Sequence, residues 1–357
     1  MQQYPEAQAI ADIIAAAQTI VIMQADNPDA DSLGSALALE HILGDLGKTP
    51  VLYCGVEIPT YLRYLEGWDR VTQELPRSFD ATVIVDASTQ TLFEKLAGSG
   101  QQGWAAAKPC IVLDHHAEVS NPIPFATVTL NDHHRSSTGE LIHSLAVQLE
   151  WPTSLAAQVN MMTAILGDTQ GLSNQLTGPA TYRAMADMTE AGVDRAVLEE
   201  RRREANRMAP TIYSYKARLI LRTEFLADGR MALVGIPQQE ITEFSPLYNP
   251  GPLIQPDMLQ TAGVRVSVVL KHYDDGKVTA AIRCNHGAPV AARLAEHFGG
   301  GGHAYASGFK IGPGAKARPF NEIKSECIAF TTALLDELEQ KRQETSDDTL
   351  QHTDALA

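Results

Sequence analysis

The stretch TIVIMQADNPDADSLGSALALEHILGDLG, residues 19–47, decides the fold of this 357-residue chain. It opens with the short apolar run 19–23, which is typical of a buried strand. A polar loop follows, and the residues from Leu33 to Leu46 then predict a helix that ends at Gly47. The stretch is therefore a strand–loop–helix unit, and the same alternation continues beyond it.

Three further apolar runs have the length of buried strands and lie at residues 51–53, 81–85 and 110–113. Helices are expected at about 90–97 and 137–149. Strands that alternate with helices form a parallel sheet, and such a sheet carries helices on both faces. The sequence therefore predicts an α/β first domain of this kind.

The pattern changes after about residue 215. Strands are expected at 231–236, 264–272 and 277–283, and the last two flank a turn. A helix, a glycine cluster and another strand follow, which predicts a smaller α+β domain. The expected boundaries are a first domain at 1–205, a linker helix at 206–222, the smaller domain at 223–342 and a disordered polar tail at 343–357.

Acidic residues outnumber basic ones by 43 to 28, which gives a net charge of −15. Tight, sequence-independent binding of long nucleic acid needs a basic face, so this balance argues against it. A small phosphorylated substrate is not excluded, since bound cations supply positive charge locally. The chain shows no signal peptide, no CxxC pair and no apolar run near the ~18 residues of a membrane span. We therefore expect a cytoplasmic protein.

Four groups of acidic residues or histidines each follow an apolar run. They are Asp29 with Asp31, Asp86, Asp114-His115-His116, and Asp168. The first three leave predicted strands, whose carboxyl ends meet at one edge of a parallel sheet, and the fourth leaves a helix. Carboxylates gathered in this way repel one another unless cations bridge them. Together with imidazoles they suit manganese, magnesium or a similar divalent ion.

The pair Asp29 and Asp31 has two interpretations. Residues two apart in an extended loop point to the same side, and the helix that starts near Gly34 and Ser35 would offer its amino terminus to a phosphate. Alternatively, the two aspartates only cap that helix. The three further groups at matching positions favour a metal site.

The segments NPDADSLGS (27–35), TVIVDAS (82–88), IVLDHH (111–116) and AILGDTQG (164–171) resemble, in that order, the four motifs of the DHH phosphoesterases. GGGGHAYASG (299–308) resembles the glycine-rich motif of the DHH-associated carboxy-terminal domain, and VTAAIRCN (278–285) resembles the strand before it. The resemblance covers about residues 10–315. The nearest branch looks like the nanoRNase/pAp phosphatases, which hydrolyse very short oligonucleotides and 3′-phosphoadenosine 5′-phosphate with manganese.

The resemblance implies roles for individual residues. Two divalent ions, manganese first and magnesium or cobalt as alternatives, are expected to share Asp86 as a bridge. Asp29 would bind one ion, and Asp31, His115 and Asp168 the other. His116 would face the phosphate, and Asp114 would orient the imidazoles. The residues expected to hold the far end of the substrate are Arg283, Asn285, Gly301, Gly302 and His303.

One position departs from the family pattern. The histidine usually found three residues before the motif's proline is Ala25 here. Gln24 or Asp26 could compensate, or water could fill the position, so an altered metal preference is one consequence to test.

A second triplet, Asp132-His133-His134, also follows an apolar run. Ser137 and Glu140 at capping-box spacing place it just before a helix start. We therefore assign the metal role to the first triplet, and leave the second, with Arg135, as a candidate for the rim of the site.

The expected reaction is hydrolysis by a water that two metals activate. Other substrates of the same fold remain open, namely cyclic or linear dinucleotides and polyphosphate. A different class is a non-catalytic nucleotide sensor. The expected partner is a small nucleotide or short oligonucleotide, without long nucleic acid or membrane, and a homodimer is possible.

Overall fold

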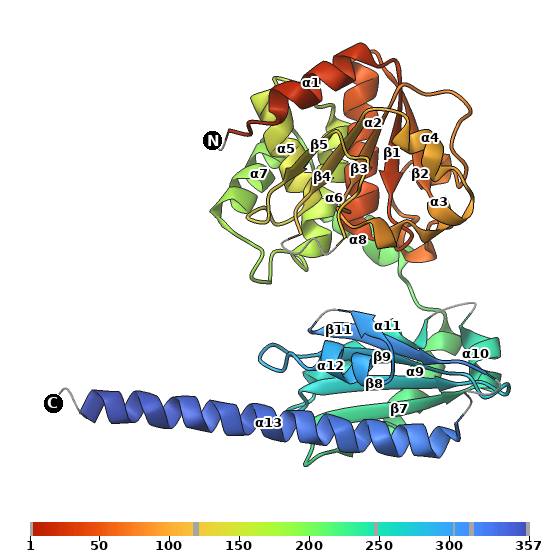
Figure 1. Cartoon of the computed structure of the whole chain (residues 1–357), viewed down its shortest axis with the longest axis vertical. Helices are drawn as coiled ribbons and strands as arrows, with labels where there is room; N and C mark the ends of the chain where they lie inside the picture. The colour runs from red at the N-terminus through yellow and green to blue at the C-terminus, as the bar shows by residue number, and fades with distance from the viewer. Residues whose placement is uncertain (1–2, 117–120, 246–248, 303, 314–317, 355–357) are drawn as a thin grey trace. The chain divides into compact units, whose positions relative to one another are not determined.

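The computed structural model describes residues 3–116, 121–245, 249–302, 304–313 and 318–354. The chain divides into two compact units, Met1–Arg207 and Met208–Ala357, which Figure 1 shows in red to green and in green to blue. Within the described residues, no helix is both long and apolar enough to cross a membrane.

The first unit is built on a sheet of five parallel strands in the order β2-β1-β3-β4-β5. The strands are β1 Thr19–Gln24, β2 Thr49–Cys54, β3 Ala81–Val85, β4 Cys110–Asp114 and β5 Val128–Asn131. In register, Ile84 pairs with Met23 on one side and with Val112 on the other, so the carboxyl ends of β1, β3 and β4 lie at one edge. The predicted parallel sheet is confirmed, and β5 is an additional short strand at its border.

Helices cover both faces of this sheet, as predicted (Figure 1). They are α1 Ala7–Ala16, α2 Ala30–Asp45, α3 Glu94–Gly98, α4 Gln102–Ala106, α5 Thr138–Gln148, α6 Leu155–Asp168, α7 Pro179–Glu190 and α8 Arg195–Ala205, with short 3-10 helices at Thr60–Leu62, Trp68–Arg70 and Gln90–Leu92. The alternation along β1 sorts the two cores. Ile22 packs with α1, α2, α5 and α6, whereas Met23 packs with α3 and α4.

Helices α2 and α6 are in direct contact. A Cβ atom at Gly34 would lie 2.8 Å from the carbonyl oxygen of Asn160, so only glycine allows this approach. The contact brings the first turn of α2, which carries Asp31, close to the last turn of α6, which carries Asp168.

The second unit contains a six-stranded sheet in the order β10-β11-β9-β8-β7-β6. Only β7 and β8 are parallel, and the other neighbours are antiparallel. One face packs against α12 and α13, and the other against α9, α10 and α11. The elements are α9 Pro210–Leu221, β6 Glu224–Leu226, β7 Met231–Pro237, α10 Gln238–Phe244, α11 Pro250–Gln260, β8 Val266–His272, β9 Val278–Cys284, α12 Ala291–His297, β10 Gly301–Gly302, β11 Ala306–Ile311 and α13 Phe320–Asp354.

Two boundaries differ from the expectation. Helix α9, expected as a linker, packs Ile212, Tyr215 and Leu219 into the core of the second unit and belongs to it. Helix α13 continues to Asp354 instead of ending at residue 342. No glycine or proline interrupts the sequence from 320 to 354, so neither of the strong helix-breaking residues stops it.

Candidate metal centre

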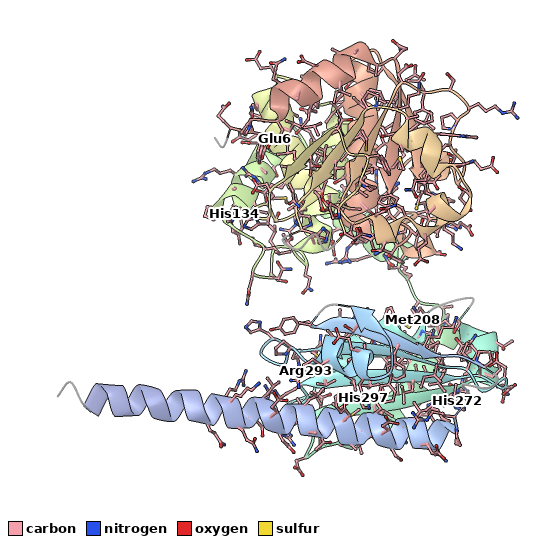
Figure 2. The ribbon with its side chains drawn as sticks, in the orientation of Figure 1. Glu6, His134, Met208, His272, Arg293 and His297 are labelled. Atoms are coloured by element: carbon pink, nitrogen blue, oxygen red, sulfur yellow. The ribbon has the colours of Figure 1, made fainter. Side chains whose placement is uncertain are left out.

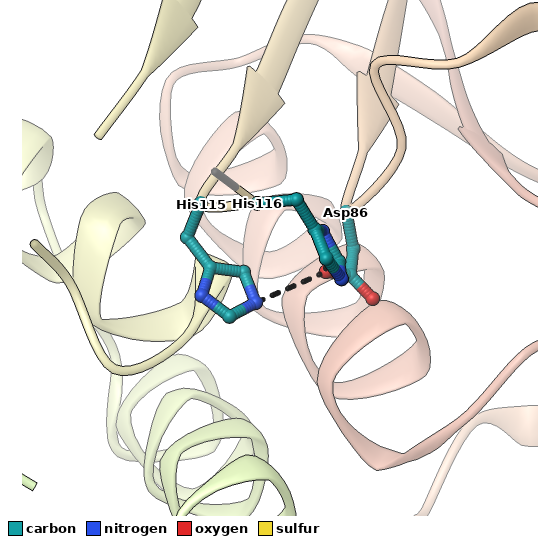
Figure 3. Close-up of side chains that lie close together, drawn as sticks. All are labelled: Asp86, His115 and His116. Atoms are coloured by element: carbon teal, nitrogen blue, oxygen red, sulfur yellow. Dashed lines mark ion pairs between the residues drawn. The ribbon is translucent and has the colours of Figure 1, made fainter. Parts of the chain in front are cut away.

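Acidic side chains and two histidines gather at the carboxyl edge of the first unit's sheet. Asp86 directly follows β3, and His115 and His116 directly follow β4. Figure 3 shows these three side chains together, with a dashed line between His115 and Asp86. Asp31 arrives from the first turn of α2, and Asp168 is the last residue of α6. Separate segments thus contribute to one place, as the sequence predicted for an open parallel sheet.

The imidazole of His115 lies at the centre of this group. Its buried Nε2 is 3.0 Å from a carboxylate oxygen of Asp168, 3.5 Å from Asp31 and 3.6 Å from Asp86, yet it makes no well-formed hydrogen bond. Its Nδ1 lies 3.3 Å from the carbonyl oxygen of Arg135. A carbonyl only accepts, so Nδ1 carries the proton in the neutral ring and Nε2 keeps its lone pair. This is the tautomer that a metal ligand needs.

The electrostatics of His115 reflect the surrounding carboxylates. Burial alone would lower its pKa, but the carboxylates of Asp168 and Asp31 outweigh burial and raise the pKa to about 9. In the absence of a cation, the ring can therefore carry positive charge that partly compensates these carboxylates.

Asp31 is fully buried and firmly held. The amides of Thr138 and Gly139 donate to its carboxylate at 2.7 and 3.0 Å, and the Ser35 hydroxyl donates at 3.0 Å. Burial, followed by the negative charge of Asp168, raises the pKa of Asp31 to about 6. Its charge is thus costly without a cation nearby.

Asp29 plays a different part from Asp31. Its carboxylate accepts from the Ser32 amide at 2.9 Å, and the Ser32 hydroxyl accepts from the Asp29 amide at 2.9 Å. Asp29 is therefore the N-cap of α2. The capping interpretation holds for Asp29 and not for Asp31, and the metal-binding role of Asp29 stays a prediction.

Asp86 adopts a left-handed backbone conformation with φ of 59°. Aspartate tolerates this region better than most residues, but it remains uncommon and is found at functional sites. The Thr138 hydroxyl donates to the Asp86 carboxylate at 3.2 Å. Burial, and then the neighbouring carboxylates led by Asp31, raise the pKa of Asp86 well above its usual value.

These groups fit a divalent cation. The ligand atoms of Asp31, His115 and Asp168 lie within 4.8 Å of one another, and those of Asp86, His115 and His116 form a second such set. A buried imidazole nitrogen without a hydrogen bond, surrounded by carboxylates with raised pKa values, is the environment that a divalent ion stabilises. Oxygen and imidazole donors suit manganese or magnesium.

Asp114 supports both histidines. Its Oδ1 accepts from the His115 amide at 2.8 Å, from the His116 amide at 3.3 Å and from His116 Nδ1 at 2.8 Å. Burial would raise the pKa of Asp114, but the hydrogen bond and charge of His116, together with Ser88, hold it below its usual value. Asp114 in turn raises the pKa of His116, whose side chain is half exposed.

The second triplet is arranged differently. Asp132 is buried and accepts from the Tyr4 hydroxyl at 3.0 Å and from Arg135 Nε at 3.1 Å. His133 and His134 stack on each other with ring centroids 4.0 Å apart, and His134 lies exposed on the first unit (Figure 2). Among the described residues, neither histidine belongs to a group that could hold a metal.

The triplet precedes a helix start, as predicted, because Ser137 caps α5 by accepting from the Glu140 amide at 3.0 Å. The side chain of Glu140 does not complete the capping box at Ser137. It accepts instead from the amide and hydroxyl of Ser136.

Ala25, which stands where the family pattern has a histidine, is surrounded by apolar side chains. Ala25 is buried in the core with Met23 and Phe93. One carboxylate oxygen of Asp26 accepts from the Lys95 amide of α3 at 2.7 Å, and the other has no hydrogen-bond partner among the described residues. Gln24 is fully buried, and neither its amide nitrogen nor its amide oxygen has a hydrogen-bond partner among the described residues. Both candidates for compensation therefore have a buried oxygen without a partner, and Gln24 has no other side-chain commitment.

The predicted substrate residues lie in the second unit. Arg283 is exposed and donates to the carbonyl of Ile282, and it forms no ion pair within the described part of the chain. Burial of part of its side chain lowers its pKa. Asn285 is used structurally, because its amide nitrogen donates to the carbonyls of Leu259 and Val264.

The glycine cluster has a structural reason of its own. Gly301 and Gly302 form β10 and pair with Gly308 and Ser307 of β11. Gly302 has a φ of 137°, and a Cβ there would lie 2.8 Å from the carbonyl oxygen of Ala306. A substrate role for this cluster stays a prediction, and His303 lies outside the described residues.

The support from α5 was not predicted from the sequence. Thr138 and Gly139 hold Asp31 and Asp86 through two amides and one hydroxyl. The signal that could have found them is the helix cap at Ser137. An amino terminus placed beside acidic clusters has free amides to offer.

Residues 19–167 match the model of the DHH family N-terminal domain. The chain is 27% identical over 305 residues to the bifunctional oligoribonuclease and PAP phosphatase NrnA of Thermus thermophilus, an alignment that covers 84% of this chain and 86% of that protein. Among solved structures, an exopolyphosphatase-related protein from Bacteroides fragilis superposes with a TM-score of 0.80 at 20% identity, covering 93% of this chain and 97% of that one. RecJ of Thermus thermophilus in complex with Mn²⁺ superposes with a TM-score of 0.52 at 17% identity, covering 92% of this chain and 54% of that one.

Proposed function

Since residues 19–167 form a DHH-family N-terminal domain, we propose that this chain is a metal-dependent phosphoesterase acting on short oligonucleotides and on 3′-phosphoadenosine 5′-phosphate. The match to the DHH family model and the similarity to the oligoribonuclease support a phosphoric ester hydrolase, and the proposal adds its substrates and its metal.

The main support for this proposal is the environment of His115. The buried Nε2 of His115 faces carboxylate oxygens of Asp31, Asp86 and Asp168 within 3.6 Å and has no hydrogen bond. A structural histidine would satisfy this nitrogen with a donor or an acceptor. Gathering three acidic groups around it is costly unless a cation is part of the site.

The residues have separate tasks in the proposed reaction. Asp31, His115 and Asp168 would hold one divalent ion, and Asp86 would share in holding a second with Asp29. When bound, such ions supply an activated water and neutralise charge on the phosphoryl group.

His116 complements this centre. Asp114, kept ionised by its hydrogen bonds, holds His116 through Nδ1 and raises its pKa. The ring is therefore more readily protonated than a free imidazole, and its side chain is half exposed. Its other nitrogen is free to donate to a phosphoryl oxygen, where it would stabilise developing negative charge.

A small substrate agrees with the charge of the chain. With a net charge of −15, the protein repels a long polyanion, so recognition must come from a few local groups. Arg283 is suited to this task because it is exposed and has no carboxylate partner in the described residues. A guanidinium in this state can bind a phosphate through two hydrogen bonds. We place this activity in the cytoplasm and include a homodimer in the proposal.

The test is a hydrolysis screen with manganese across 3′-phosphoadenosine 5′-phosphate, dinucleotides, cyclic dinucleotides, polyphosphate and a generic phosphodiester. We expect the first two to have the highest kcat/KM. A preference for cyclic dinucleotides or polyphosphate would replace the substrate proposal while keeping the metal centre. Nucleotide binding without any turnover would mean a non-catalytic sensor.

Recognition by Arg283 is tested in the same assay. Arg283→Ala should raise KM for the nucleotide about tenfold, through loss of a charge-assisted contact, and leave the generic ester unchanged. Arg293→Ala is the matched control, because Arg293 is also exposed in the second unit but is paired with Glu337. An equal loss on both substrates would place Arg283 in the catalytic centre.

A further inference from the structure

A buried ionic cluster lies directly behind the metal centre of the first unit. Arg135 is 9% exposed and donates from Nε to the carboxylate of Asp132 at 3.1 Å and to the Tyr4 hydroxyl at 2.8 Å. Its Nη1 donates to Glu140 at 3.1 Å. The guanidinium thus joins the first residues of the chain, the end of β5 and the first turn of α5.

Glu140 closes the cluster on its other side. Its Oε2 accepts from the Ser136 hydroxyl at 2.6 Å, the Ser136 amide at 3.2 Å and the Thr181 hydroxyl at 2.8 Å. Glu140 and Asp132 are both buried, so their charges depend on Arg135 for compensation. The segment from 132 to 140 is therefore held at both ends by the same side chain.

This segment contacts the metal centre through its backbone and one hydroxyl. The carbonyl of Arg135 accepts from His115 Nδ1. The amides of Thr138 and Gly139 hold the carboxylate of Asp31, and the Thr138 hydroxyl holds Asp86. Three of the proposed ligands thus take their orientation from a segment that the side chain of Arg135 locks.

We propose that Arg135 is a positioning residue for the metal centre, acting through the 132–140 segment to fix His115, Asp31 and Asp86. The inference rests on the proposed function, because it assigns these three side chains to a bound cation. Arg135 is not a member of either group of side chains that could hold a metal. Its effect is on how well the ligands are preorganised, and supporting groups of this kind change metal affinity about 10- to 100-fold.

A purely structural role makes a different prediction. If the cluster only stabilised the fold, a folded variant would bind manganese as the wild type does. If it positions the ligands, manganese affinity falls even in a variant that remains folded. Metal binding without substrate separates the two, independently of turnover.

The experiment measures the manganese dissociation constant of the substrate-free full chain by calorimetry, with the unfolding midpoint of the chelated protein as the folding check. Arg135→Lys keeps the charge but cannot reach Asp132 and Glu140 together in the same geometry. We expect about a 10-fold weaker affinity in this variant and a larger loss in Arg135→Met. Arg70→Met is the matched control, because Arg70 forms an ion pair with Glu40 elsewhere in the first unit, and it should bind manganese normally.

Tyr4→Phe is the second variant, since it removes one hydroxyl from the cluster and leaves no buried charge unpaired. It should weaken manganese binding less than Arg135→Lys but in the same direction, and it decides the question if neither Arg135 variant folds.

Two failures are distinguishable. Wild-type protein that binds no manganese and hydrolyses no phosphate ester overturns the proposed function. Wild-type protein that binds manganese, with folded Arg135→Lys and Tyr4→Phe variants that bind it equally well, overturns the positioning role alone.

Discussion

The two Asp-His-His triplets use the same three residue types after neighbouring strands, yet they do different things. In the first, Asp114 accepts from its own two histidines, and His115 faces three other carboxylates. In the second, Asp132 is bound by Arg135 and Tyr4, and its histidines lie outside the cluster. The carboxylates around the first triplet are therefore paired with histidines, whereas Asp132 of the second triplet is paired with an arginine.

Strand position explains the difference. β4 is an interior strand, so its carboxyl end lies beside Asp86 at the end of β3. β5 is the border strand with a neighbour on one side only. The same sequence motif is thus surrounded by acids in one place and by the α5 segment in the other. What a triplet can do is decided by its neighbours in the sheet, which a local motif does not contain.

Removing the cation should have the largest effect on activity. With a chelator in excess, activity should fall at least about 1000-fold, because the charge stabilisation and the activated water are both lost. Manganese should restore it best. Asp86→Ala should give a loss of the same order on every substrate, and this loss should persist in saturating manganese. Full turnover in excess EDTA would contradict a metal-dependent mechanism.

Replacing one histidine of each triplet by alanine should have very different effects on activity. His115→Ala removes the nitrogen that three carboxylates surround, so kcat should fall about 100-fold or more and manganese affinity should drop. His133→Ala serves as the matched control and should change kcat less than about threefold, because His133 is exposed and belongs to no potential metal-binding group among the described residues. Steady-state kinetics and calorimetry on both folded variants measure the difference. Equal losses would mean that the second triplet also takes part.

The sequence was sufficient to predict the parallel sheet that places the first triplet in the site. Runs such as 81–85 and 110–113 are continuous and apolar, so their strands, the parallel sheet and the carboxyl edge could all be predicted. Asp86, His115 and Asp168 then follow because they leave that edge or a neighbouring helix. Strand β5 could not be predicted in this way, since Val128–Asn131 is short and mixes polar with apolar residues.

The contacts around the second triplet could not be predicted from the sequence either. Tyr4 contacts Asp132 across 128 positions of sequence, and Arg135 compensates two buried acids at once. Neither contact has a local periodicity or a spacing that a motif could carry. The same holds for Ala25, whose packing against Phe93 depends on how α3 returns to the sheet.

The folding stability of the metal-free protein should depend on pH through the first triplet and the carboxylates beside it, and not through the second triplet. The pKa of Asp31 is raised to about 6, so the folded state binds its proton more tightly than the unfolded state, and stability falls as pH rises from about 4 past 6. The pKa of His115 is raised to about 9, so its contribution is complete below about 6.5 and is lost as pH rises through 9. Both groups therefore make the folded state less stable as the pH rises.

In EDTA, the unfolding temperature should therefore decrease between pH 5 and pH 9, by an amount on the order of 5 °C. Differential scanning calorimetry across this range measures it. Manganese should restore more stability at the higher pH, because the ligands are then deprotonated. His115→Ala should lose the part of the slope between 6.5 and 9, whereas His133→Ala should keep it. An unfolding temperature that does not change with pH in EDTA would contradict the proposed repulsion among these carboxylates.

The smallest expected effect lies at the end of β1, on the other side of Asp86 from the first triplet. Met23 pairs with Ile84, so Ala25 and Asp86 lie two residues further along the same two neighbouring strands. Ala25→His would add a nitrogen donor there. If that position is under-coordinated, the weaker manganese site should bind about tenfold more tightly, and activity at limiting manganese should rise.

The result for Ala25→His depends on two opposing effects, the added metal ligand and the disturbed apolar packing. Ala25 is 5% exposed and packs among apolar side chains, so a larger residue costs stability whether or not it binds metal. Ala25→Leu is the control, since it adds bulk without a donor and should lower the unfolding temperature without improving affinity. Gln24→Leu tests the alternative, because Gln24 is the buried neighbour with a free amide. If Ala25→His leaves the manganese titration unchanged while Gln24→Leu weakens it, then Gln24 already supplies the missing ligand, and the end of β1 joins the first triplet in the metal centre.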